Sequence, residues 1–177
     1  MEQMKTDEER LYHDIVQNRE TRGINISELG EDMAVGEQVI GQYWKPRFLI
    51  DHRNRTAVEF MSLSKILQTV THDDIMWETL ASASNRAMSR ARALSFHFPS
   101  FICAYKKGVA EVVWQLNPDG MYYMDDDGFG MTPDEEYNIY GFIDRQGRVL
   151  SKFRHVKSDS ELEDMRLEAQ RKISVRR

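Results

Sequence analysis

The sequence predicts an α+β fold. A helical N-terminal half of about four to five helices and one β-hairpin packs on a mainly antiparallel C-terminal sheet, and a C-terminal helix follows. Three observations predict this fold. Apolar residues recur at steps of three and four through most of residues 7–94, which is the period of a helix. From Ser95 the chain alternates at period two, the period of a strand. Turn-forming tetrads stand at 117–120 and 144–147.

The length of 177 residues favours a single domain that covers residues 1–177. Within it, residues 1–60 have the element order of a winged-helix-like subdomain. Residues 61–177 would then contain the long helix and the antiparallel sheet.

Capping and breaking residues divide the N-terminal half into elements. Thr6 and Glu9 have the spacing of a capping box and Gly23 is a natural stop, so a first helix is expected over about 7–21. Pro46 prevents a second helical stretch from continuing. The elements expected after the first helix are two short helices over 27–44 broken near Ala34–Gly36, a hairpin of strands 47–51 and 55–60 around His52-Arg53-Asn54, a helix from Ser62 to about Val70, and a long helix from Thr71 to about Leu94.

The C-terminal half is expected to be a series of hairpins. In the tetrad 117–120, Pro118 presets the turn and Gly120 accepts a positive φ, which favours a tight hairpin there with Trp114 on its core face. A final amphipathic helix is expected over about 159–173. The expected strands are 100–106, 109–116, 121–126, 137–144 and 148–156.

One segment is echoed along the chain. Residues 48–60 align without gaps to residues 141–153, with Asp51 matching Asp144 and Asn54 matching Gly147. The simplest interpretation is two hairpins with the same kind of turn. The second copy also resembles one unit of a WG-type repeat, but a single unit does not form a repeat array.

Composition limits the kind of protein. The sequence has no apolar run of membrane-spanning length and its N-terminus has no apolar signal region, so a cytoplasmic location is expected. The single cysteine, Cys103, excludes an internal disulfide and a cysteine-based zinc site. It lies in an apolar run and is expected to be a buried, inert thiol.

Residues 27–44 resemble the helix-turn-helix pattern of bacterial regulators. Ser27 would open the first helix, and Ile40 would lie on the apolar face of the second. The resemblance implies a winged-helix DNA-binding regulator. However, residues 1–60 contain eight Lys and Arg against twelve Asp and Glu, a balance that disfavours binding to phosphates. The DNA contacts implied would be Gln38, Gln42, Lys45, Arg53 and Arg55.

A second charge pattern is acidic. Residues 108–144 contain nine acids and no Lys or Arg. A hairpin turn at 117–120 would place Glu111 opposite Asp127, with Asp125 on the same outer face. Because like charges directly opposite each other repel, a basic partner, a cation or solvent should compensate them. The spacing does not fit an EF-hand, so no metal site is assigned.

These patterns favour a non-catalytic cytoplasmic binding or regulatory protein that acts through a protein partner. Its contact surface would be the acidic face of Glu111, Asp125 and Asp127, and the partner surface would be basic. The alternative is the winged-helix-like DNA-binding regulator, and the third hypothesis is a small carboxylate or metal-assisted enzyme. No catalytic residue and no cofactor are predicted, because the sequence has no P-loop, no G-x-S-x-G and no H-E-x-x-H motif.

Overall fold

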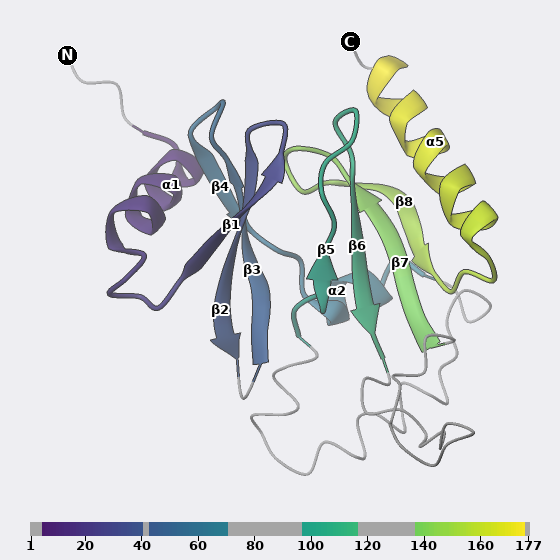
Figure 1. The fold of residues 1–177 in the computed structure, drawn as a ribbon, viewed down its shortest axis with the longest axis horizontal. Helices are drawn as coiled ribbons and strands as arrows, with labels where there is room; N and C mark the ends of the chain where they lie inside the picture. Colours follow the sequence, from purple (N-terminus) through teal and green to yellow (C-terminus); the bar gives the residue numbers. More distant parts are fainter. Residues whose placement is uncertain (1–4, 41–42, 71–96, 117–136, 176–177) are drawn as a thin grey trace, which may run out of the picture.

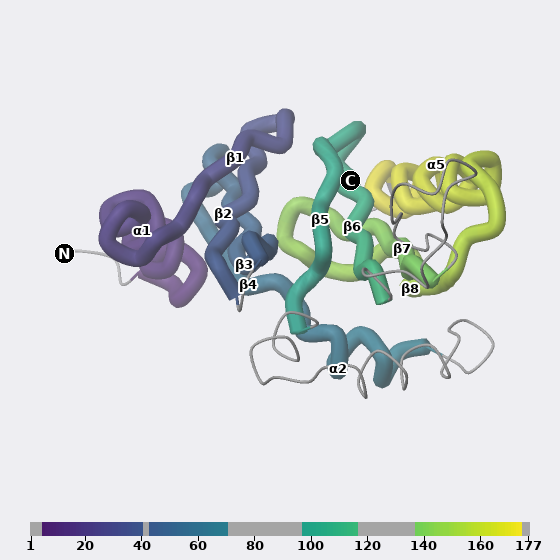
Figure 2. The backbone as a smooth tube through the Cα atoms, turned by 60° about the horizontal axis from the view of Figure 1, so that its bottom comes forward, coloured from purple at the N-terminus to yellow at the C-terminus, as the bar shows by residue number. Residues whose placement is uncertain are grey.

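The computed structural model describes residues 5–40, 43–70, 97–116 and 137–175, and these residues form four layers (Figure 1). Helix α1 covers a four-stranded antiparallel sheet, sheet A, which stacks on a second, sheet B, and α5 covers the far face of sheet B. Short α2 lies beneath the two sheets (Figure 2). The elements are α1 (Asp7–Asn18), β1 (Asn25–Gly30), β2 (Met33–Ile40), β3 (Tyr43–Asp51), β4 (Thr56–Glu59), α2 (Leu63–Leu67), β5 (Phe101–Ile102), β6 (Ala110–Gln115), β7 (Asn138–Ile143), β8 (Val149–Arg154) and α5 (Asp159–Val175).

The predicted helical N-terminal half is wrong. Residues 27–44, expected as two helices, contribute instead to β1, β2 and β3. The chain reverses between β1 and β2 through a run of positive φ angles, +80° at Gly30, 54° at Glu31 and 61° at Asp32, and such a run is incompatible with a right-handed helix. Gly36 then lets neighbouring side chains approach closely, because a Cβ there would lie 3.2 Å from Ile24. The helix-turn-helix interpretation is therefore wrong, because these residues form strands and not helices.

The sequence prediction holds where caps and turns determine the structure. Thr6 and Glu9 form both hydrogen bonds of the capping box at the start of α1. Ser62 accepts a hydrogen bond from the backbone N–H of Lys65 and so caps α2. The expected long helix over 71–94, the turn at 117–120 and the strand 121–126 lie outside the described residues.

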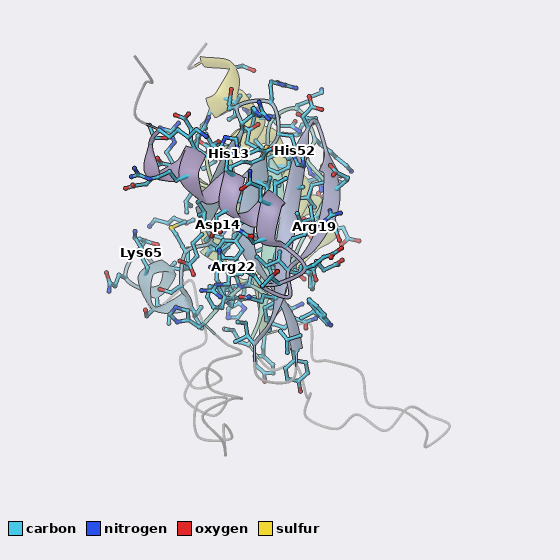
Figure 3. The ribbon with its side chains drawn as sticks, turned by 90° about the vertical axis from the view of Figure 1, so that its left-hand side faces the viewer. His13, Asp14, Arg19, Arg22, His52 and Lys65 are labelled. Atoms are coloured by element: carbon cyan, nitrogen blue, oxygen red, sulfur yellow. The ribbon has the colours of Figure 1, made fainter. Side chains whose placement is uncertain are left out.

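Sheet A is a meander in the order β1-β2-β3-β4. Its outer face is covered by Tyr12 and Ile15 of α1, which pack against the face that contains Phe48 and Ile50. Figure 3 shows α1 across this face, with His13 and His52 at the same end. There the Oη of Tyr12 lies 2.9 Å from Nδ1 of His52, which ties the helix to the β3–β4 turn.

Sheet B has the order β5-β6-β7-β8. β6 lies between β5 and β7, and Glu111 stands opposite Phe142 of β7. Asp127, the partner expected from the sequence, lies outside the described residues. Trp114 is buried as expected, at 2% exposure.

The main core lies between the two sheets. Sheet A contributes Leu29, Met33, Val35 and Leu49, and sheet B contributes a set that includes Trp114 and Phe153. The backbone also links the sheets, since the N–H of Tyr105 donates to the carbonyl oxygen of Leu29 over 2.7 Å. The two sheets therefore share one core rather than forming separate ones.

In both echoed hairpins an aspartate side chain accepts hydrogen bonds from backbone N–H groups of the turn. Oδ1 of Asp51 accepts the backbone N–H groups of Arg53 and Asn54, and Oδ1 of Asp144 accepts those of Gln146 and Arg148. Both aspartates are buried, and these hydrogen bonds satisfy them.

The strands that begin the two echoed segments, β3 and β7, point matching side chains in the same direction along the layer order α1, sheet A, sheet B, α5. Ile50 faces α1 and its match Ile143 faces sheet A, whereas Leu49 faces sheet B and its match Phe142 faces α5. The sheets therefore stack in the same sense and do not mirror each other across the core.

Gly141 gives a direct test of the packing in sheet B. A Cβ at this glycine would lie 2.6 Å from three ring atoms of Phe153, whose ring is itself buried against Trp114. We expect Gly141→Ala to destabilise the protein by about 1–3 kcal/mol, because the ring cannot move away freely. Urea unfolding measures this change.

The smaller side chain of Phe153→Leu provides the matched background. There the additional cost of Gly141→Ala should fall, since the clash is with the ring. Equal costs in the two backgrounds would show that the ring does not cover Gly141.

Candidate functional site

Of the three residues predicted to form an acidic face, the structure describes only Glu111. Glu111 is 9% exposed and lies on the α5 side of sheet B. Its Oε1 is 3.8 Å from Nη2 of Arg166, and its Oε2 accepts a hydrogen bond from Sγ of Cys103 over 3.3 Å. Asp125 and Asp127 lie outside the described residues. Glu111 is therefore covered by α5 and has an internal cation.

The residues predicted to contact DNA lie at two opposite ends of sheet A. Gln38 and Lys45 are cross-strand neighbours on β2 and β3. Arg53 and Arg55 lie in the β3–β4 turn at the other end, where Arg53 pairs with Asp32 over 3.5 Å. Gln42 is outside the described residues. The described residues of 36–45 thus form strands rather than a recognition helix, and Lys45 lies far along sheet A from Arg53 and Arg55.

A protruding two-stranded ribbon is the most exposed apolar feature of the described chain. We define the ribbon as residues 38–40 of β2 and 43–45 of β3. The pairing of β1 ends at Glu37 and that of β4 ends at Phe48, so neither strand adjoins the ribbon. A β-bulge between Gly36 and Glu37 separates the ribbon from the rest of β2.

Large apolar side chains cover the ribbon. Val39 and Trp44 stand directly opposite each other and share one face, with exposures of 49% and 53%. Tyr43, 46% exposed, lies on the other face opposite Ile40. Contiguous exposed apolar side chains of this size are typical of binding surfaces.

The sequence contained a signal for the ribbon that was misinterpreted. The helix-turn-helix pattern predicts Ile40 and Tyr43 on the apolar face of its second helix, because residues three apart fit a helical step. The glycines that flank and interrupt this stretch favour a strand and turn instead, and a strand leaves these side chains in solvent.

Lys45 adds a cationic side chain to the ribbon. Its Nζ lies 6.0 Å from the ring centroid of Tyr43. Burial of the ammonium lowers the pKa of Lys45 to about 8. The ribbon therefore carries a cation that is partly neutral in mildly alkaline solution.

A buried ion pair joins the turns of the two echoed hairpins. Nη2 of Arg145 lies 2.8 Å from Oδ1 of Asp51, and the two side chains are 15% and 4% exposed. Nη1 of Arg145 also donates to the carbonyl oxygen of Glu31. Because Arg145 belongs to the β7–β8 turn and Asp51 ends β3, the pair fixes sheet B against sheet A.

Cys103 is half-buried rather than fully buried. Burial and the neighbouring Glu111 raise the pKa of its thiol to about 11. The thiol is therefore protonated at neutral pH, which makes it a poor nucleophile. Within the ranges that the structure covers, no three His, Cys, Asp or Glu side chains lie close enough together to hold a metal ion.

Comparison with known proteins gives no further constraint on function. A scan against protein-family models and searches of curated proteins and of solved structures found no match. Among the residues described, no helix has the length and apolar character needed to cross a membrane.

The buried ion pair generates a stability prediction. Arg145→Met should destabilise the fold by about 3 kcal/mol, since it removes the cation from a carboxylate that stays buried. The control is Arg53→Met, whose pair with Asp32 is solvent-exposed and should cost between 0 and about 1 kcal/mol. Chemical denaturation of the two variants compares them directly, and equal losses would contradict the role of Arg145.

The lowered pKa of Lys45 generates a labelling prediction. The amine reacts with an anhydride only when neutral, so labelling of Lys45 should reach half its maximal rate near pH 8. A lysine in a short peptide has a pKa of about 10.4 and serves as the reference. Mass spectrometry of peptides labelled at a series of pH values gives both curves, and coincident curves would show that Lys45 is not desolvated.

Proposed function

We propose that this chain is a non-catalytic binding protein of the cytoplasm that acts through a protein partner, and that the ribbon is its contact surface. The observation that carries the proposal is the opposed pair Val39 and Trp44, each about half exposed on the part of β2 and β3 that neither β1 nor β4 flanks. Tryptophan and tyrosine dominate the binding energy of protein interfaces, because they bury large areas with few rotatable bonds.

The geometry favours a partner with an apolar pocket. Trp44 and Val39 would insert into it from one face, and Tyr43 would border it from the other. A basic rim around that pocket would complement the net charge of −5. Glu111 of the predicted acidic face is not part of this surface, since it is covered and paired with Arg166.

Photo-crosslinking tests the ribbon as a contact site. A photoreactive phenylalanine analogue in place of Trp44 should form an adduct with a second protein in host cells. The same analogue at Val149, an exposed position on β8, provides the matched control and should form no such adduct. The outcome that counts against the proposal is the same adduct at both positions, or none at position 44.

Competition adds a quantitative test. Unlabelled wild-type protein should suppress the adduct, whereas Tyr43→Ala with Trp44→Ala should weaken competition at least tenfold, because hot-spot residues contribute about 2 kcal/mol or more each. The free energy of unfolding should change little, since these side chains are exposed. Undiminished competition by the double variant would remove the ribbon from the interface.

A further inference from the structure

A second feature, separate from the ribbon, is the open edge of β4. This strand ends the strand order of sheet A, and no described strand pairs with its other edge. Alternate residues of an edge strand direct their backbone N–H and C=O groups away from the sheet, where a further strand can bond to them. Thr56 of β4 stands opposite Asp51, at the end of β3 that is farther from the ribbon.

A hollow of about 530 Å³ opens beside this edge. Residues 56–58 of β4 line it, together with the first turn of α1 and the β7–β8 turn. Its rim is accessible to solvent, since Glu8, Asn54 and Arg148 are all exposed. A chain bound in this hollow would therefore lie at the edge of sheet A rather than between the two sheets.

The two sides of the β4 edge carry opposite charges. Ala57 packs with the residues under α1, whereas Val58 packs against the core between the sheets, so one face of β4 meets α1 and the other meets sheet B (Figure 1). On the α1 side the hollow is lined by Glu8 and Glu9, and on the sheet B side by Arg148. A strand added beside β4 would direct its side chains alternately toward the acids and toward the cation.

Charged groups on both sides are accessible to a ligand. Glu8 has no ion-pair partner among the described residues. Arg148 is held at two of its nitrogens, since its Nε lies 3.2 Å from Oδ2 of Asp144 and its Nη2 lies 3.2 Å from Oε1 of Gln146. These contacts orient the guanidinium while its side chain stays 69% exposed. Arg145, the other cation of the lining, is 15% exposed and already paired.

From this geometry we propose that the edge of β4 binds an extended segment of another protein by strand addition. The segment carries basic side chains on its α1 side and acidic side chains on its sheet B side. Main-chain hydrogen bonds supply the affinity, and the alternate side chains supply the specificity. A shift of the segment by one residue turns every side chain to the opposite face and sets like charges against each other, so the charge pattern selects one register. This contact does not depend on the ribbon.

Two blocked hexapeptides of the same composition test this pattern on the full chain labelled with ¹⁵N. In Val-Lys-Glu-Lys-Glu-Val the lysines share one face of a strand and the glutamates share the other, whereas in Val-Lys-Lys-Glu-Glu-Val each face carries both charges. The first peptide should bind about tenfold more tightly than the second. It should also shift the backbone amide signals of residues 56–58 in a saturable manner. Equal affinities, or signals of 56–58 that stay in place at millimolar peptide, would overturn the proposal.

A pair of variants tests the α1 side separately. Glu8→Gln should weaken the alternating peptide about threefold, because it removes one solvent-accessible charge pair. The control Glu20→Gln removes the same charge beyond the end of α1, outside the hollow, and should leave the affinity unchanged. Both side chains are exposed, so urea unfolding should give nearly the same free energy for the two variants. Equal losses of peptide affinity in the two variants would overturn the assignment of the α1 side.

Discussion

The apolar contact between sheets A and B is the constraint on which the rest of the structure depends. Each sheet buries one face under a single helix, but two of the three largest fully buried side chains, Trp114 and Phe153, lie between the sheets. Transfer of such side chains out of water is the dominant favourable term in folding, at about 1.5–3 kcal/mol for a large apolar side chain. Neither sheet could keep its inner face dry without the other.

Polar contacts fix how the two sheets are aligned. The apolar contact between them does not set this alignment. Apolar packing is not directional, but the pair of Arg145 with Asp51 and the hydrogen bond from Tyr105 to Leu29 each require one alignment. Gly147 of the β7–β8 turn also packs close to sheet A, since a Cβ there would lie 3.4 Å from Val58 and 3.5 Å from Leu49.

Much of the structure follows from local sequence signals. The capping box of Thr6 and Glu9 predicted the start of α1, and the tetrad 144–147 predicted the β7–β8 turn, because these signals involve neighbouring residues only. The stretch 27–44 was wrongly expected to be helical. Its apolar residues fit both periods, and what decides for strands is the distant partner β3 together with the positive φ run at Gly30–Asp32.

The candidate sites also depend on residues that are distant in the sequence. The exposure of Trp44 could not be predicted from sequence, since it depends on where β1 and β4 stop pairing. The burial of Glu111 depends on α5, whose residues lie some fifty positions further along the chain. The sequence placed both residues in regular structure but could not place the neighbours that cover or expose them.

Native-state hydrogen exchange measures most directly whether the two sheets form one cooperative unit. The amide of Tyr105 bonds to Leu29 across the sheets, whereas the amides of Ile50 and Val112 lie within sheets A and B. If the sheets depend on each other, all three amides exchange through global unfolding, with free energies of opening that agree within about 1 kcal/mol. Exchange of Ile50 or Val112 through a much lower free energy than the other would show that one sheet opens alone, and would contradict the shared core.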